Sequence, residues 1–302
     1  MTEIKASEHW KRLVPEIQKT GGPVMVIGAP DSGKTTLARF LARELAEQGE
    51  KVAYIDGDMG QSILGPPTTQ AMALFDRSFT DLEKAPVGGV YFVGSVSPRG
   101  HRLETVVGLK RLLERSQVDR NRIAILDTTG YVAGDDALEL KHQKIDLLGP
   151  RHIIAVQQAR EIEPILSVQK GRERASIQRL PSSSLVQTRS QEDRRRYRWN
   201  RYKEYFKSLR MHEVDLKEAA LTGTHRFRIS EGAQGHLEGL IVGLNDGDGF
   251  LVTLGILEKL DRPKKILSCL VPSKTDLERV RTVRMGSIGI DLSEETNGER
   301  FI

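Results

Sequence analysis

The distribution of hydrophobic and polar positions predicts alternating strands and helices over the first half of the chain. Short apolar runs that end in glycine or aspartate are typical of buried strands, and longer stretches rich in alanine, leucine, arginine and glutamate are typical of helices. The predicted strands are Val24–Ile27, Val52–Ile55, Val90–Val93, Ile123–Leu126 and Ile153–Val156. The predicted helices are Ser7–Lys19, Thr35–Gln48 and Leu103–Leu113. This alternation predicts an α/β fold with a mostly parallel sheet covered on both faces.

The pattern changes after Glu163, where comparable apolar runs stop and a Pro-Ser-Ser-Ser break follows. We therefore expect a helical insertion, with a lid over about residues 181–210. At helical spacing its apolar and basic positions fall on different faces, Tyr202, Phe206 and Leu209 on one and Arg194, Arg198 and Arg201 on another. One side of this helix should pack, and the other should be free to bind.

From about Leu221 the chain consists of short apolar segments separated by turns such as Asn245–Gly249. The segments are H-R-F-R-I-S, L-E-G-L-I-V-G-L-N, F-L-V-T-L-G-I-L-E-K-L and K-K-I-L-S-C-L-V. They predict a small β-rich domain over 221–302, after an N-terminal helix over 1–20 and a P-loop domain over 21–220. The terminal domain could bind substrate, support the lid or meet a partner, and its composition does not decide among these roles.

Composition excludes several classes of protein. The 302 residues are 38% hydrophobic, which is ordinary for a globular chain. No run approaches the roughly 18 apolar residues that a membrane span needs, and the start lacks the apolar core of a signal peptide, so we expect a cytoplasmic protein with no membrane partner. The single cysteine, Cys269, excludes an internal disulfide and fits a buried strand position better than a nucleophile.

The positive charge is concentrated in one segment. Between Arg189 and Lys203 there are seven cations and two acids, which sum to the +5 net charge of the whole chain. Such a run is either a solvated helix face or a surface that meets phosphate.

The clearest chemical motif is Gly28–Thr35, which fits G-x-x-x-x-G-K-[ST] between a predicted strand and a predicted helix. Its backbone N–H groups and the helix N-terminus would hold phosphates, Lys34 would reach the outer phosphates, and the Thr35 hydroxyl would ligate Mg²⁺. The candidate residues for binding a nucleoside triphosphate are Gly28, Ala29, Pro30, Asp31, Ser32, Gly33, Lys34, Thr35 and Thr36.

Acidic residues follow two other predicted strands. Asp56 and Asp58 come directly after Val52–Ile55, and Asp127 after Ile123–Leu126. The carboxyl ends of parallel strands line the ligand crevice, so these acids should face the phosphate loop. One of the first pair could hold Mg²⁺ through water while the other accepts a proton from an attacking hydroxyl, and Asp127 would anchor the hydration shell of the metal.

The ordered set of motifs resembles the polynucleotide 5'-hydroxyl kinase family. The set comprises the phosphate loop, D-G-D-M-G-Q-S-I-L-G-P-P-T-T, Y-F-V-G-S-V-S-P-R-G, D-T-T-G-Y with E-L-K-H-Q-K-I-D-L-L-G-P, H-I-I-A-V-Q and the arginine-rich segment. That family includes the kinase subunit of the eukaryotic pre-mRNA 3'-end cleavage factor, pre-ribosomal RNA processing kinases and archaeal relatives. The resemblance implies transfer of the ATP γ-phosphate to the 5'-hydroxyl end of RNA or DNA.

The resemblance also implies roles for individual residues. Asp58 matches the hydroxyl-activating acid, and Lys34 and Thr35 match the phosphate and Mg²⁺ residues. Arg189 and Arg194, in the stretch that matches a mobile lid, would contact the transferring phosphate. Gln61, Tyr131 and Arg198 would bind the substrate. Family members often have tryptophan where this chain has Tyr131.

Three other interpretations stay open from the residues alone. A GTP-binding switch protein would use Gly28–Thr35, Asp127–Gly130 and Ser273–Asp276, which imitate GTPase signatures in order. A partitioning or metal-delivery ATPase would carry a second lysine near the start of the loop, where this chain has Ala29. A nucleic-acid-binding module could also use the basic segment to grip RNA without any kinase activity.

Overall fold

The computed structural model describes residues 7–78, 82, 85–116, 123–169, 174–183, 186–224, 237–295 and 297–301. Contacts divide the chain into two compact units. The first comprises Met1–Asp58, Gln70–Gly89 and Pro98–Arg189, and the second comprises Met59–Thr69, Val90–Ser97 and Ser190–Ile302. The arginine-rich helix therefore belongs to the same unit as the C-terminal sheet, which differs from the boundary expected near residue 220.

The first unit is built on a sheet with the strand order β4-β3-β2-β5-β1-β6-β7. In chain order its strands are β1 (Pro23–Gly28), β2 (Val52–Gly57), β3 (Thr69–Phe75), β4 (Val87–Phe92), β5 (Ile123–Thr128), β6 (His152–Gln157) and β7 (Ser176–Pro181). Strands β2, β5, β1, β6 and β7 pair in parallel, whereas β3 is antiparallel to β2. The central strands are almost wholly buried, which explains why they appear as short apolar runs.

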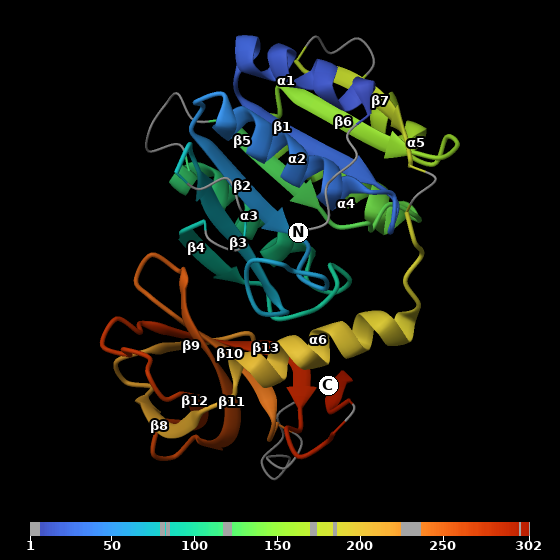
Figure 1. The fold of residues 1–302 in the computed structure, drawn as a ribbon. Helices are drawn as coiled ribbons and strands as arrows, with labels where there is room; N and C mark the ends of the chain where they lie inside the picture. Colours follow the sequence, from blue (N-terminus) through green and yellow to red (C-terminus); the bar gives the residue numbers. More distant parts are fainter. Residues whose placement is uncertain are drawn as a thin grey trace. The chain divides into compact units, whose positions relative to one another are not determined.

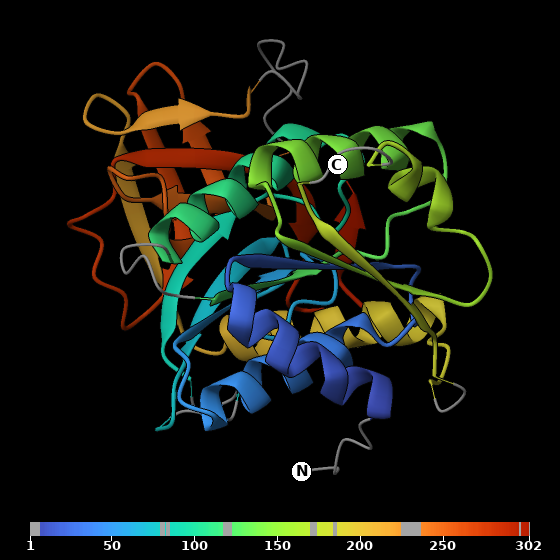
Figure 2. The same cartoon turned by 90° about the horizontal axis from the view of Figure 1, so that it is seen from above.

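Helices cover both faces of this sheet, α1 and α2 on one and α3 and α4 on the other (Figures 1 and 2). The helices of the first unit are α1 (Glu8–Thr20), α2 (Lys34–Glu47), α3 (Arg102–Ser116), α4 (Asp135–Leu148) and the short α5 (Glu163–Ser167). Ser7 caps α1 by accepting the Trp10 N–H, and Gly21 ends it with a positive φ of 62°. The predicted α/β fold with a mostly parallel sheet is confirmed.

Two strands of the first sheet were not predicted. Strand β7 lies in the stretch expected to be helical, and that expectation was wrong for Ser176–Pro181. Leu180 alone among the residues of β7 is buried, so this edge strand lacks the apolar run that marks a buried strand. Strand β3 is buried but contains threonine, glutamine and alanine and has no valine or isoleucine, so its composition does not reveal it as a strand.

The second unit contains helix α6 (Gln191–Tyr205) and a largely antiparallel sheet with the order β14-β13-β10-β11-β12-β8. Its strands are β8 (Leu209–Asp215), β9 (Ala220–Thr222), β10 (Leu240–Asn245), β11 (Leu251–Asp261), β12 (Ile266–Pro272), β13 (Thr282–Ile290) and β14 (Glu299–Phe301). Strand β9 lies off this path and pairs with β13 in parallel. The predicted β-rich terminal region is confirmed, although its sheet includes β8, before Leu221. The segment H-R-F-R-I-S lies outside the described residues.

One face of the second sheet carries the core that holds α6. Trp199, Tyr202 and Phe206 pack with Ile241, Leu254 and other buried residues of the sheet. The predicted apolar face is thus confirmed for Tyr202 and Phe206, whereas Leu209 begins β8 instead of continuing the helix. Cys269 is buried on β12, as predicted, and burial raises the pKa of its thiol to about 12.

Candidate active site

The phosphate loop connects β1 to α2, the arrangement that its sequence predicts. Gly28 is required by space, because a Cβ atom there would lie 2.4 Å from the Val156 carbonyl oxygen and 2.5 Å from Ser32 Oγ. Gly33 is required by conformation, because its φ is 92° immediately before α2 begins. The loop therefore aims the N-terminus of α2 at the space where phosphates bind in such motifs.

Lys34 lies inside this loop. Its side chain is almost fully buried, and Nζ donates to the Ala29 carbonyl oxygen at 2.6 Å and to Ser32 Oγ at 3.4 Å. An ammonium group is thus held within the ring of backbone atoms that would surround a triphosphate. Hydrogen bonds to charged groups are stronger than neutral ones, and phosphate oxygens could replace these two acceptors.

The segment after β7 passes along the phosphate loop within the same unit. Ser182 Oγ donates to the Ser32 carbonyl oxygen at 3.1 Å, and the Arg189 N–H donates to Asp31 Oδ2 at 3.1 Å. Asp31 adopts a φ of 52°, which is unusual for a residue with a side chain. These contacts bring the backbone of Arg189 to the phosphate loop, as its predicted role requires.

Asp127 lies at the carboxyl end of β5, next to Asp56 on β2, with which it is paired in register. Tyr54 Oη donates to Asp127 Oδ2 at 3.0 Å. Burial raises the pKa of Asp127, while the nearby Thr35 hydroxyl and the charge of Lys34 lower it. Oδ1 is buried and has no hydrogen-bond partner within the described parts of the chain. This unpartnered oxygen beside Thr35 fits a Mg²⁺ site.

The described residues contain no group of three or more His, Cys, Asp or Glu arranged to hold a metal. This is compatible with Mg²⁺, which is usually held by one or two carboxylates together with the phosphates of the substrate and water.

The turn after β2 is shaped by Asp56. Its side chain is buried, and Oδ1 accepts the N–H of Asp58 at 3.1 Å, which folds the chain back after the strand. Asp58 itself is half-buried. Its charge raises the pKa of Asp127 and also that of Lys144, so the three side chains share one electrostatic environment. The two aspartates of this turn therefore have different surroundings, as the predicted division of labour requires.

Tyr131 follows β5 beyond Gly130 and is half-buried. A Cβ atom on Gly130 would lie 2.7 Å from the Pro30 nitrogen, so the chain passes directly against the phosphate loop at this point. The absence of a side chain at Gly130 is what allows this close approach.

Sequence reasoning missed two lysines on α4. Lys141 and Lys144 are fully buried, on the face of the helix that also carries Leu140 and Ile145. Lys141 Nζ donates to Thr128 Oγ1 at 2.9 Å and to the Thr129 carbonyl oxygen at 2.8 Å. Their position among apolar residues at helical spacing was the signal, because charged residues are rarely placed on a buried face without a role.

Lys144 is the more unusual of the two. Among the residues that the structure describes, Nζ of Lys144 has no hydrogen-bond partner. Burial lowers its pKa to about 8, although the charge of Asp58 opposes this shift. A buried ammonium without a partner is costly to the folded state, so its presence favours a role in the site.

We expect Lys144→Met to stabilise the protein by about 3 kcal/mol at pH 7, because methionine fills similar space without a buried charge. Between pH 8 and 10.5 the unfolded chain keeps a proton on Lys144 that the folded chain has lost. The free energy by which this lysine destabilises the folded state therefore falls as pH rises through that window. Denaturant unfolding should show a smaller difference in free energy of unfolding between Lys144→Met and wild type at pH 10 than at pH 7. The partly exposed Lys110→Met is the control, and a variant less stable than wild type at pH 7 would contradict the account.

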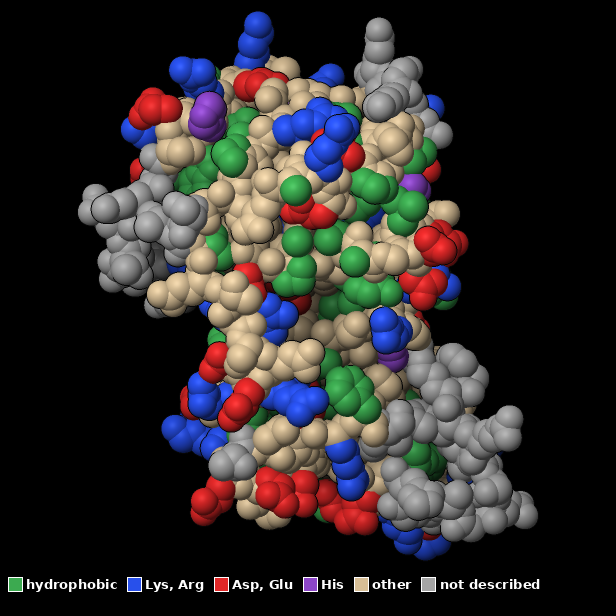
Figure 3. All heavy atoms as spheres, turned by 90° about the vertical axis from the view of Figure 1, so that its right-hand side faces the viewer, with side chains coloured by type: hydrophobic (Ala, Val, Ile, Leu, Met, Phe, Trp, Pro, Cys, Tyr) green, Lys and Arg blue, Asp and Glu red, His purple; other side chains and the backbone are tan. Residues whose placement is uncertain are grey.

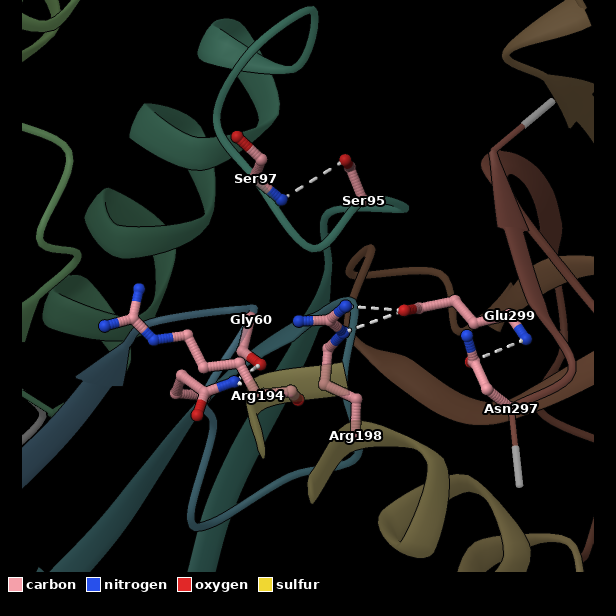
Figure 4. A network of polar contacts seen from close by, with 8 residues as sticks. Gly60, Ser95, Ser97, Arg194, Arg198, Asn297 and Glu299 are labelled. Atoms are coloured by element: carbon pink, nitrogen blue, oxygen red, sulfur yellow. Dashed lines mark hydrogen bonds and ion pairs between the residues drawn. The ribbon is translucent and has the colours of Figure 1, made fainter. Parts of the chain in front are cut away.

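Gln61, Arg194 and Arg198 belong to the second unit. Gln61 Nε2 donates to the Gly60 carbonyl oxygen at 2.7 Å and to the Arg194 carbonyl oxygen at 3.4 Å. Arg198 is buried and binds Glu299 through two nitrogens, at 2.8 Å from Nε and 2.5 Å from Nη2, as Figure 4 shows. Arg201 Nη2 donates to the Gly65 carbonyl oxygen at 2.6 Å. The expected free face of three arginines is therefore wrong, because Arg198 and Arg201 are engaged within their own unit.

The positive charge of α6 is also partly balanced at its surface. Arg196 pairs with Asp193 at 2.5 Å, one turn earlier on the helix. On the face drawn in Figure 3, Lys and Arg side chains lie interspersed with Asp and Glu.

No described helix is long and apolar enough to cross a membrane.

Comparison with known proteins agrees with this architecture. The model of the family described as mRNA cleavage and polyadenylation factor CLP1 P-loop matches residues 28–208. A polyribonucleotide 5'-hydroxyl-kinase of Methanocaldococcus jannaschii is 31% identical over 91% of this chain and 89% of its own length. Another from Pyrococcus abyssi is 30% identical over 88% and 87%, respectively.

A CLP1 homologue of Culex quinquefasciatus is 29% identical over 70% of this chain and 52% of its own length. Among solved structures, the wild-type Clp1p–Pcf11p complex has a chain of the same fold, with a TM-score of 0.68 and 14% identity over 92% of this chain and 77% of that one. The match to the family model and the identity with the archaeal proteins over most of both lengths show that the chain belongs to the CLP1 P-loop family.

Proposed function

We propose that this protein is an ATP-dependent polynucleotide 5'-hydroxyl kinase that transfers the γ-phosphate of ATP to the 5'-hydroxyl end of RNA. The observation that carries the proposal is the half-buried Asp58 on the turn that Asp56 shapes after β2, close enough to the buried Asp127 for its charge to raise the pKa of that carboxyl. The archaeal relatives, which are polyribonucleotide 5'-hydroxyl-kinases, support the same activity.

The first unit supplies the residues that would hold ATP. Backbone N–H groups from Gly28 to Thr35 and the N-terminus of α2 would bind the phosphates, and Lys34 would exchange its loop acceptors for phosphate oxygens. Thr35 and Asp127 would hold Mg²⁺, with the unpartnered Oδ1 as the free ligand atom. When bound, Mg²⁺ would neutralise charge on the phosphate oxygens.

Asp58 would act on the acceptor. Its carboxylate would accept the proton of the 5'-hydroxyl while the hydroxyl oxygen forms a bond to the γ-phosphorus and the bond from that phosphorus to the β-phosphate oxygen breaks, releasing ADP.

Arginines would complete the charge balance. Arg189, whose backbone is tied to Asp31 of the loop, and Arg194 on α6 would contact the transferring phosphoryl group. Tyr131 would lie against the terminal nucleotide and Gln61 would bind it. The bidentate pair with Glu299 favours a structural role for Arg198 over direct substrate contact.

The GTP-binding alternative has less support. Ser273–Asp276 follows β12 in the second unit, whereas the phosphate loop and Asp127 belong to the first. A switch protein also has no use for the turn that presents Asp58. Competition between ATP and GTP tests this point, because GTP preference that is lost in Asp276→Ala would favour the switch protein.

The proposed function is tested by a single-turnover reaction with γ-labelled ATP and an oligonucleotide that has a 5'-hydroxyl end. We expect label in RNA, and a parallel DNA oligonucleotide would determine whether DNA is also accepted. Label that appears only as inorganic phosphate, at the same rate with and without oligonucleotide, would point to a nucleic-acid-binding ATPase instead.

A further inference from the structure

Helix α6 holds the loop that carries Gln61. The chain from Met59 to Thr69 belongs to the second unit, although it directly follows Asp58, the last residue of that segment of the first. Tyr197 Oη on α6 donates to the Ser62 carbonyl oxygen at 2.8 Å, and Arg201 Nη2 reaches the Gly65 carbonyl oxygen at 2.6 Å. Two side chains one turn apart on α6 thus bind two carbonyl groups, three residues apart, of one loop.

The helix is itself fixed to the C-terminal sheet. Arg198, between the two loop-binding side chains, binds Glu299 of β14, and the side chain of Glu299 is only 2% exposed. Trp199 and Tyr202 are buried against strands of the same sheet. A capping box formed by Ser190 and Asp193 fixes where α6 begins. A helix held by packing, an ion pair and a cap is a rigid base for the loop.

A second connection joins the same loop to the sheet. Val93 and Gly94 donate their N–H groups to the Thr68 carbonyl oxygen, at 2.9 and 3.1 Å. The Gly94 carbonyl oxygen in turn accepts the N–H of Ser287 on β13 at 2.7 Å. A Cβ atom on Gly94 would lie 2.9 Å from the Gly286 Cα, so this contact requires glycine. The loop is therefore held by α6 at Ser62 and Gly65 and is connected to β13 at its Thr68 end.

We propose that Tyr197 and Arg201 are positioning residues for the nucleic-acid acceptor, and that the C-terminal sheet serves as the base on which the Met59–Thr69 loop is held. The inference rests on the proposed function for the identity of the acceptor. It assigns the loop-binding arginine a role distinct from that of Arg189 and Arg194, because Arg201 meets carbonyl oxygens of the protein and not phosphate.

The variant that tests this role is Arg201→Met, which keeps the aliphatic stem and removes the donors. We expect the KM for a 5'-hydroxyl RNA oligonucleotide to rise roughly tenfold, as is typical when a buried carbonyl loses a charged donor, while the KM for ATP stays unchanged. Arg201→Lys should recover most of the affinity, since an ammonium can still donate to the Gly65 carbonyl. Lys207→Met, exposed just beyond α6, is the control and should behave as wild type.

Hydrogen exchange supplies a readout that does not depend on activity. In Arg201→Met the amides of residues 60–65 should exchange faster, whereas those of the phosphate loop should not change. Tyr197→Phe is the milder second variant and should give smaller changes in the same direction, which keeps the test valid if Arg201→Met folds poorly.

The outcomes separate the two proposals. An RNA KM within twofold of wild type, together with unchanged exchange in the loop, would overturn the positioning role. A wild-type protein that phosphorylates no 5'-hydroxyl oligonucleotide would overturn the proposed function, and the exchange experiment would then still decide whether α6 holds the loop.

Discussion

Asp58→Asn should lower the rate of phosphoryl transfer by about 10²–10⁴-fold, the usual contribution of a general base. Asparagine fills the same space but cannot accept the proton of the attacking hydroxyl. Asp58 is not part of the phosphate loop. The hydrogen bond that shapes the turn runs from the backbone N–H of Asp58 to the Asp56 side chain, and the substitution keeps this N–H. ATP binding should therefore stay within a fewfold of wild type, so that the defect appears in kcat.

Single-turnover kinetics with saturating ATP measure the loss of phosphoryl transfer. Equilibrium binding of ATP measures whether the affinity for ATP is retained. Asp76→Asn is the matched control, because Asp76 is an exposed aspartate directly after β3. Wild-type activity in Asp58→Asn would remove the assignment of this residue as the base. A parallel loss of ATP binding and turnover would mean that Asp58 supports the nucleotide site instead.

Lys34→Met should lower kcat by about 10²–10³-fold, the range seen when one preorganised donor to developing charge is removed. Methionine can follow the same path through the loop, but it leaves the Ala29 carbonyl oxygen without the hydrogen bond at 2.6 Å that Lys34 makes. The effect should include weaker ATP binding, because the lysine would contact phosphates before and during transfer. In this respect the expected result differs from that of Asp58→Asn.

The measurement is ATP affinity by calorimetry together with the kinase rate. Lys19→Met, an exposed lysine at the end of α1, is the control. If Lys34→Met bound ATP and transferred phosphate as wild type does, the phosphate loop would not be the donor site.

Local patterns were sufficient to predict the part of the fold that places the phosphate loop. Val24–Ile27 and Ile123–Leu126 are buried on both faces, so their apolar runs reveal them, and the Gly28–Thr35 motif fixes the turn between β1 and α2 by the space and φ that its glycines require. The sequence also predicted that Asp56 and Asp127 follow strands whose carboxyl ends lie at one edge of the sheet, and the strand register pairs these two residues.

Features that depend on distant partners were not predictable in this way. Arg198 has the same local sequence surroundings as its neighbours, but Glu299, 101 positions later, determines that it is buried. The helical spacing of Lys141 and Lys144 indicates that they share a face with apolar residues, but the buried partners of Lys141, Thr128 and Thr129, lie on a different element. Strand β7 is exposed enough to lack an apolar run, and only pairing with β6 makes it a strand.

The division of the chain gives the candidate residues a simple grouping. Residues proposed to hold ATP belong to the first unit, whereas Gln61 and Arg194 belong to the second. Asp58, the proposed base, is the last residue before the chain passes from one unit to the other. On the proposed function, this grouping would account for the C-terminal sheet, because the sheet would support the proposed acceptor residues.

The most direct test of the central claim compares three RNA oligonucleotides that differ only at the 5' end, with a hydroxyl, a phosphate or a 5'-deoxy terminus, in the presence of γ-labelled ATP. The account predicts label on the 5'-hydroxyl RNA alone, released by a phosphatase that acts on 5'-terminal phosphates. Equal labelling of all three, or labelling of none while ATP is hydrolysed, would contradict it.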